Sequence, residues 1–263
     1  MPTALTEDGY TINYLIDDFT DSWKKSETAF LAPGLSGSSS SAYALVPGLA
    51  RKYRVARIDP RGSGQSTETP PRYRWALDQF ATDTKVVLDH LEVEKVHYIG
   101  SSFGGVVGQL FAALFPERLK SLVLCTSPYY FPQAIASWAD MIDQIGAEAF
   151  FRQDLAKLYG PDADPGMVEW AVQQRMRSNI DRLKELYRFA ATINLGDLLP
   201  KITVPTLIIA AELSDRALLN DAKFMHEQIP NSELVVFEKQ YHGVANVMPE
   251  KCIEVILKFL EKV

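Results

Sequence analysis

Short apolar runs alternate with longer segments of helical periodicity along most of this 263-residue chain. The apolar runs predict strands at residues 11–16, 27–32, 53–59, 95–100, 119–125, 204–211 and 233–237. The helical periodicity predicts helices at 77–91, 103–115, 217–228 and from 249 onward. Because a helix between two strands joins them in parallel, this order predicts an α/β fold with a mainly parallel sheet that helices cover on both faces.

The alternation stops between residues 127 and 199, where every periodic segment is helical. We expect residues 1–126 and 200–263 to form the α/β core and 127–199 to form a helical cap at the carboxyl edge of the sheet, where ligands bind. Large apolar residues of the cap are expected to roof a pocket in part: Trp138, Phe150, Phe151, Trp170 and Phe189. The basic residues of the cap are expected to form a solvated helix face: Arg175, Arg177, Arg182, Lys184 and Arg188. The alternative is that one of these arginines contacts a carboxylate of the substrate.

Charge and composition narrow the possible partners. The chain carries 27 Lys and Arg against 33 Asp and Glu, and its net charge of −6 disfavours binding to nucleic acid. No apolar run approaches the length of about 18 residues that spans a bilayer, and the N-terminal residues do not resemble a signal peptide, so we expect a cytoplasmic protein that does not bind membranes. Cys125 and Cys252 lie in apolar segments and predict buried free thiols. No His or Cys spacing suggests a metal site.

The motif Gly100-Ser-Ser-Phe-Gly104 follows a predicted strand and begins a predicted helix. A serine on such a tight turn needs an unusual backbone conformation and small residues two positions away on each side, which Gly100 and Gly104 provide. The turn would expose the Ser102 hydroxyl at a helix N-terminus, where developing negative charge is favoured. We therefore predict that Ser102 is a nucleophile.

A serine nucleophile requires a base and an acid that orients the base. His242 lies in a predicted loop after the last strand, whereas His90, His97 and His226 lie within or at the ends of predicted helices and strands; these three we interpret as structural. The acid should also follow a strand. No carboxylate follows residues 119–125 closely, but Glu212 and Asp215 follow residues 204–211, and we favour Asp215 because it lies deeper in the turn.

With these residues placed, the chain resembles the α/β-hydrolase superfamily over nearly its whole length. The segment Asp59-Pro-Arg-Gly-Ser-Gly-Gln-Ser66 is similar to a loop of that family, as is the placement of His242 seven residues before Pro249. The order of Ser102, Asp215 and His242 is that of the family's nucleophile, acid and base. The stretch 104–125 resembles the 3-oxoadipate enol-lactonase and small esterase branch. The resemblance implies an eight-stranded sheet, a helical cap and no cofactor.

One segment departs from the family pattern. Pro33-Gly34-Leu35 stands where the family usually has His-Gly, after the third strand. By position, the N–H groups of Leu35 and Phe103 would bind the oxyanion, and Ser36 stays open as a neighbouring alternative. The missing histidine makes the geometry of the first donor a specific question for the structure.

These features predict a hydrolase that cleaves a small to medium, partly apolar carboxylic ester or lactone through an acyl-enzyme on Ser102. The alternatives are a carbon–carbon bond hydrolase of ring-cleavage products, a ligand receptor on the same scaffold, and a cofactor-free oxygenase or perhydrolase. The carbon–carbon bond hydrolases typically carry a Trp shortly after the histidine, where this chain has Val244 and Ala245. Dehalogenases and epoxide hydrolases of this fold use an aspartate in place of Ser102. The sequence does not specify the oligomeric state.

Overall fold

The computed structural model describes residues 2–263, in which eight strands form one sheet in the order β1-β2-β4-β3-β5-β6-β7-β8. Strands β1 and β2 are antiparallel to each other, as are β2 and β4, and the remaining neighbours are parallel. The predicted eight-stranded, mainly parallel α/β fold is therefore confirmed. The strands are β1 (Thr3–Leu5), β2 (Thr11–Asp17), β3 (Thr28–Ala32), β4 (Arg54–Ile58), β5 (Val96–Ser101), β6 (Leu119–Cys125), β7 (Thr206–Ala211) and β8 (Ser232–Phe237).

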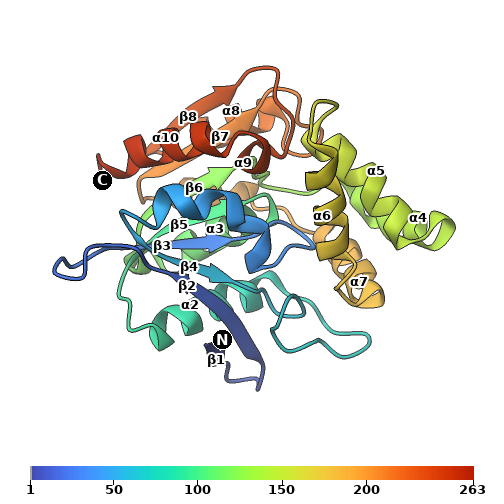
Figure 1. Ribbon diagram of the computed structural model, residues 1–263, viewed down its shortest axis with the longest axis horizontal. Helices are drawn as coiled ribbons and strands as arrows, with labels where there is room; N and C mark the ends of the chain where they lie inside the picture. The colour runs from blue at the N-terminus through green and yellow to red at the C-terminus, as the bar shows by residue number, and fades with distance from the viewer. Residues whose placement is uncertain (1) are drawn as a thin grey trace.

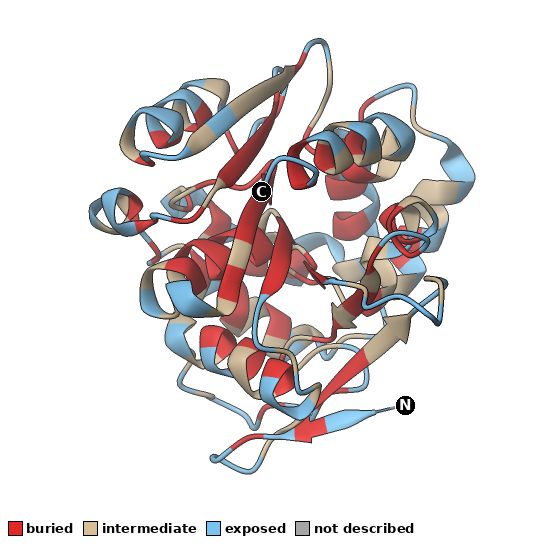
Figure 2. Cartoon of the chain, turned by 90° about the vertical axis from the view of Figure 1, so that its left-hand side faces the viewer, coloured by how far each residue is buried: buried red, intermediate tan, exposed pale blue. Residues whose placement is uncertain are grey.

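Helices cover both faces of the sheet (Figure 1). One face packs against α2 (Leu77–His90), α3 (Phe103–Leu114) and α8 (Leu219–Gln228). The other packs against α1 (Val46–Leu49), α9 (Val244–Val247) and α10 (Pro249–Leu260). The two faces arise because successive side chains of a strand point in opposite directions, so that Tyr98 lies in the first core and Ile99 in the second. Figure 2 shows the buried residues concentrated in the central strands and in the helix faces that meet them.

A third apolar cluster lies mainly in the proposed cap, residues 127–199, which is the stretch of chain that connects β6 to β7. Phe150, Phe151 and Tyr187 are buried there, and Phe103 and Val107 of α3 join the same cluster from the core. Figure 1 shows α4–α7 gathered at one end of the sheet. The elements of this segment are η3 (Gln133–Ser137), α4 (Trp138–Ile145), α5 (Ala147–Tyr159), α6 (Pro165–Arg175), α7 (Ile180–Ala190) and η4 (Gly196–Lys201).

Local chemistry fixes several boundaries. Asp164 accepts a hydrogen bond from the Gly166 N–H and caps α6, with Pro165 at the first helical position, and Asn179 caps α7 in the same way. Strand β7 begins at Thr206, two residues later than the apolar run predicted. Pro205 has no N–H with which to join the ladder.

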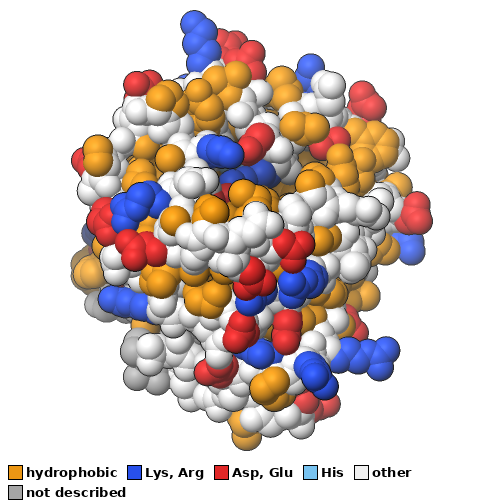
Figure 3. Space-filling view, turned by 90° about the vertical axis from the view of Figure 1, so that its right-hand side faces the viewer, with side chains coloured by type: hydrophobic (Ala, Val, Ile, Leu, Met, Phe, Trp, Pro, Cys, Tyr) orange, Lys and Arg blue, Asp and Glu red, His pale blue; other side chains and the backbone are white. Residues whose placement is uncertain are grey.

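The surface over α4–α7 carries positive and negative side chains interspersed with apolar ones (Figure 3). Ion pairs between neighbouring helices account for part of this pattern, since the Lys184 ammonium lies 2.7 Å from Asp143 of α4 and 2.9 Å from Asp181. Over residues 2–263, no helix is both long enough and apolar enough to span a membrane.

Candidate active site

Ser102 lies at the tight turn between β5 and α3, with φ 51° and ψ −115°. This left-handed φ is rare for a residue with a side chain. The flanking glycines permit the turn, because a Cβ at Gly100 would lie 2.5 Å from the Gly105 backbone and a Cβ at Gly104 would lie 2.3 Å from the carbonyl oxygen of Ala32. The Ser102 N–H donates to the Cys125 carbonyl at 3.0 Å, which fixes the turn against β6. The geometry has the features that the Gly-x-Ser-x-Gly motif predicted.

His242 lies in the loop between β8 and α9 and is only 4% exposed. Its carbonyl accepts a hydrogen bond from the Thr126 hydroxyl at 2.8 Å, at the end of β6. The next N–H, that of Gly243, donates to the Leu158 carbonyl of α5 at 2.8 Å. The imidazole is therefore held between the sheet edge and the proposed cap. Ser102 and His242 both line one cavity of about 560 Å³.

The Nδ1 atom of His242 lies 2.9 Å from the Ser214 hydroxyl oxygen, not beside a carboxylate. The same oxygen accepts hydrogen bonds from the Ala217 N–H at 3.1 Å and from the Arg216 N–H at 3.4 Å. Ser214 is buried in the loop that follows β7. It therefore occupies the position, relative to the imidazole, at which the acid was expected.

The favoured acid, Asp215, points elsewhere. Its side chain is 60% exposed, and its carboxylate lies 3.4 Å from Arg216 Nε. The alternative, Glu212, accepts a hydrogen bond from the Lys239 N–H at 2.7 Å. Within the described chain neither carboxylate bonds to His242. The geometry therefore does not place Asp215 beside His242, and Ser214, one position earlier, contacts Nδ1 instead. Consecutive side chains of a turn point in different directions, and no periodicity in a loop shows which one faces the histidine.

Burial, together with the nearby positive charges of Arg216 and Arg175, lowers the pKa of His242 to about 3, although the Asp154 carboxylate acts in the opposite direction. The imidazole is therefore neutral at pH 7. A neutral imidazole is the form that can accept or donate a proton at either nitrogen, depending on its tautomer.

We expect the acid limb of kcat/KM for hydrolysis at this site to lie below about pH 4, at least two units below that of an ordinary imidazole. The sign follows from the lowered pKa of His242, whose neutral form is lost only as the pH falls through about 3. Rates would be measured by brief pH jumps, with tryptophan fluorescence to show that the protein stays folded. A limb between pH 6 and 7 in the folded protein would contradict the expectation.

A buried cluster of three charges borders the same cavity. Asp154 of α5 lies 2.7 Å from Arg175 Nη1 and also bonds to Arg216 Nη2. Burial alone would raise the pKa of Asp154, but Arg175 and Arg216 outweigh it and hold this pKa below its usual value. The prediction that Arg175 belongs to a solvated face is wrong, because its guanidinium is mostly buried against Asp154. The partner lies 21 residues away in sequence, so helical periodicity could not indicate it.

The proposed oxyanion donors lie beside Ser102. Phe103 is the first residue of α3, where an N–H has no partner within the helix. Leu35 follows Gly34, where a Cβ would lie 3.4 Å from the Cβ of Ser102. Across residues 2–263, neither N–H donates to a backbone carbonyl, so both are available to a ligand. Ser36 has φ 65°, and its hydroxyl lies 2.7 Å from that of Tyr187 in α7. This hydrogen bond joins the loop after β3 to the proposed cap.

The described residues contain no group of three or more His, Cys, Asp and Glu side chains that could hold a metal ion. Both cysteines are buried and free, as the apolar context predicted.

Comparison with known proteins agrees with this arrangement. The sequence profile of a family described as having the alpha/beta hydrolase fold matches residues 30–159. The chain is 27% identical to 3-oxoadipate enol-lactonase 2 of Acinetobacter baylyi over 202 residues, 74% of each chain. It is 25% identical to the pimeloyl-[acyl-carrier protein] methyl ester esterase of Aeromonas hydrophila, over 83% of this chain and 89% of that one.

The architecture recurs in a solved hydrolase from Pseudomonas aeruginosa, with a TM-score of 0.87, 26% identity, and coverage of 98% of this chain and 97% of that one. The elbow at Ser102, the mainly parallel eight-stranded sheet and the lactonase and esterase relatives all lead to the same assignment. This chain has the α/β-hydrolase fold, and its sequence resembles that family.

Proposed function

We propose that this protein is a serine hydrolase that cleaves a small to medium, partly apolar carboxylic ester or lactone through an acyl-enzyme on Ser102. The observation that carries the proposal is the strained backbone of Ser102, φ 51°, at the border of a cavity that it shares with His242. A left-handed serine is costly to hold and is concentrated at functional sites. The lactonase and esterase relatives support the same bond class.

In the proposed reaction, the Ser102 oxygen attacks the substrate carbonyl carbon while His242 Nε2 accepts the hydroxyl proton. The N–H groups of Leu35 and Phe103 would stabilise the oxyanion, at about 3 kcal/mol for each donor. His242 then gives the proton to the leaving oxygen, and the carbon–oxygen bond of the ester or lactone breaks. Water, deprotonated by His242, attacks the acyl carbon; the bond to the Ser102 oxygen breaks, the acid leaves, and Ser102 takes its proton back from His242. The steps require no cofactor.

The cavity supports the proposed substrate size. Its volume of about 560 Å³ suits a molecule of drug-like dimensions. Trp138, Leu155 and Leu158 contribute apolar surface from the proposed cap, while Gln174 and Ser38 contribute polar groups. A hydrolysis screen of acyl esters of graded chain length, alongside several lactones, tests the proposal. We expect a maximum at an intermediate chain length, whereas no turnover of any ester or lactone would refute it.

The receptor alternative has one specific observation in its favour. The Nδ1 partner of His242 is the Ser214 hydroxyl, which cannot stabilise an imidazolium as a carboxylate does. A site of this kind would bind a carbonyl compound and turn it over slowly. A chromogenic acyl ester separates the two functions, since steady multiple turnover supports the hydrolase and a single slow acylation supports the receptor.

Trp170 offers a test of substrate contact. It is 37% exposed, borders the cavity, and packs edge to face on Tyr43 with ring centroids 4.8 Å apart. We expect Trp170→Ala to raise KM several-fold and to change the chain-length preference, because the ring would cover the apolar part of the substrate. The melting temperature should change little, since the ring is already partly in water.

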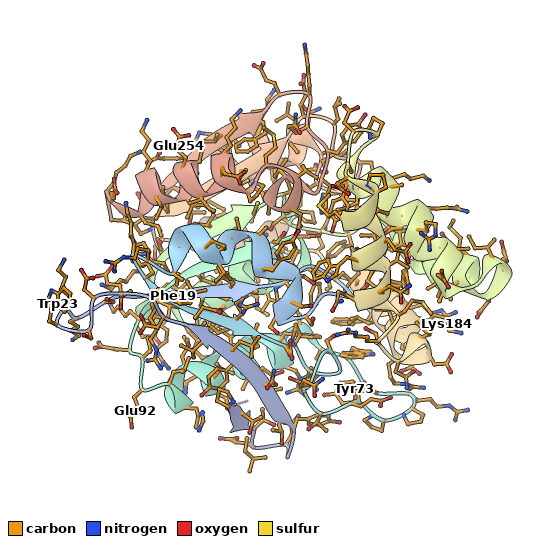
Figure 4. All side chains as sticks on the ribbon, in the orientation of Figure 1. Phe19, Trp23, Tyr73, Glu92, Lys184 and Glu254 are labelled. Carbon is orange, nitrogen blue, oxygen red and sulfur yellow. The ribbon has the colours of Figure 1, made fainter. Side chains whose placement is uncertain are left out.

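The matched control is Trp23→Ala. Trp23 is 79% exposed, and Figure 4 shows it in the loop between β2 and β3, at the opposite end of the molecule from α4–α7. It should leave both KM and the chain-length preference unchanged. Equal effects of the two substitutions on KM would show that Trp170 does not contact the substrate.

A further inference from the structure

The hydrogen bonds around Ser214 determine which way its own proton points. A hydroxyl has one O–H donor and two acceptor lone pairs. Two backbone N–H groups, those of Ala217 and Arg216, already donate to the Ser214 oxygen. The remaining neighbour is Nδ1 of His242 at 2.9 Å. If Nδ1 also donated, the oxygen would face three donors, and its own proton would have no acceptor among the described residues.

We infer that Ser214 donates its hydroxyl proton to Nδ1 of His242, holds the imidazole proton on Nε2, and thereby limits the activation of Ser102. The inference rests on the proposed function, since it concerns how the same base is prepared. It makes Ser214 a positioning residue that acts through His242. With Nε2 protonated, the imidazole presents a donor to Ser102, where the proposed reaction needs an acceptor.

Among the described residues, the surroundings of Nε2 offer no partner that would oppose this assignment. It is buried and makes no hydrogen bond to any described residue, Ser102 included. Nucleophilic attack would first require the imidazole proton to move to Nδ1 and the Ser214 hydroxyl to turn away. The three charged groups that act on the imidazole are Arg216, Arg175 and Asp154, which together carry one net positive charge. They disfavour the imidazolium that forms when Ser102 loses its proton.

The test is Ser214→Asp, with Ser214→Asn as the isosteric control. A carboxylate can only accept hydrogen bonds. It would accept one from each of the two backbone N–H groups and a third from Nδ1–H, which leaves Nε2 unprotonated and free to act as a base. We expect kcat/KM for an activated ester to rise at least about tenfold in Ser214→Asp and not in Ser214→Asn. The acid limb should also move up by more than one pH unit, because the carboxylate favours the charged imidazole. Asp215→Asn should change neither quantity.

The tautomer is measured directly by ¹⁵N NMR of the imidazole in the wild-type protein. Protonation at Nε2 supports the inference even if Ser214→Asp fails to fold, and protonation at Nδ1 overturns it. A folded Ser214→Asp variant with Nδ1 protonated and no gain in kcat/KM also overturns it. Failure of the proposed function is a different result: a fluorophosphonate that leaves Ser102 unlabelled in both the wild type and Ser214→Asp, whatever the tautomer.

Discussion

Replacing Ser102 with alanine is expected to lower kcat for an activated ester by about 10²–10³-fold while the protein stays folded. In a serine protease, loss of the acid alone costs about 3 × 10⁴ in kcat and loss of the whole triad about 2 × 10⁶, so a serine and histidine without the acid retain about 10²-fold of catalysis. Ser214 stands at the acid position here, so the remaining contribution of Ser102 should be of that order. The methyl group of alanine fits where the serine side chain sits, so stability should change little.

Two measurements accompany the kinetics. A fluorophosphonate should label the wild-type protein on Ser102 and should not label Ser102→Ala, as read by peptide mass spectrometry. Ser137→Ala serves as the control, since among residues 2–263 its exposed hydroxyl bonds only to the Ala134 carbonyl, within η3. Near-native turnover in a folded Ser102→Ala variant would exclude the serine mechanism.

The core of the fold was predictable because its signals are local. Apolar runs located each strand from β2 to β8, and the spacing of apolar residues located α2, α3, α8 and α10. The strands and α-helices of the core that the sequence did not indicate are short: β1 has three residues and α1 and α9 have four each. Elements of this length depend on the partners they pack against, and no periodicity can develop over three or four residues.

The candidate site was predictable to the extent that backbone geometry dictates residue type. The turn at Ser102 requires small residues at positions 100 and 104, so the two glycines of the motif indicate this backbone conformation directly. The partner of His242 had no such signature, because a serine, an aspartate or a glutamate in a loop each satisfies the local backbone equally well. Only the three-dimensional direction of the Ser214 side chain distinguished it from Asp215.

The second large effect concerns stability and arises from Arg61, in the loop between β4 and α2. The side chains of Arg61 and Asp83 are only 2% and 1% exposed. Two parallel hydrogen bonds of 2.7 Å and 2.5 Å join them, and Arg61 also donates to Asp8 and to Tyr73, which is labelled in Figure 4. Although burial disfavours the charged guanidinium, the bonds from Asp83 and Asp8 outweigh it and raise the pKa of Arg61.

We expect Arg61→Ala to lower the free energy of unfolding by about 3–5 kcal/mol, because it leaves the Asp83 carboxylate buried without its partner. Arg51 provides the control: its pair with Asp21 lies on the surface, with an Arg51 side chain 63% exposed, and Arg51→Ala should cost less than about 1 kcal/mol. Urea unfolding measures both values.

The double variant Arg61→Ala with Asp83→Ala identifies the cause of the loss. If the unpaired carboxylate is responsible, removing it as well should recover part of the stability, so that the double variant unfolds at a higher urea concentration than Arg61→Ala alone. Strictly additive losses would instead show that packing of the guanidinium, for example over the Tyr10 ring at 4.9 Å, dominates. The pair would then stabilise this loop through contact area and not through charge.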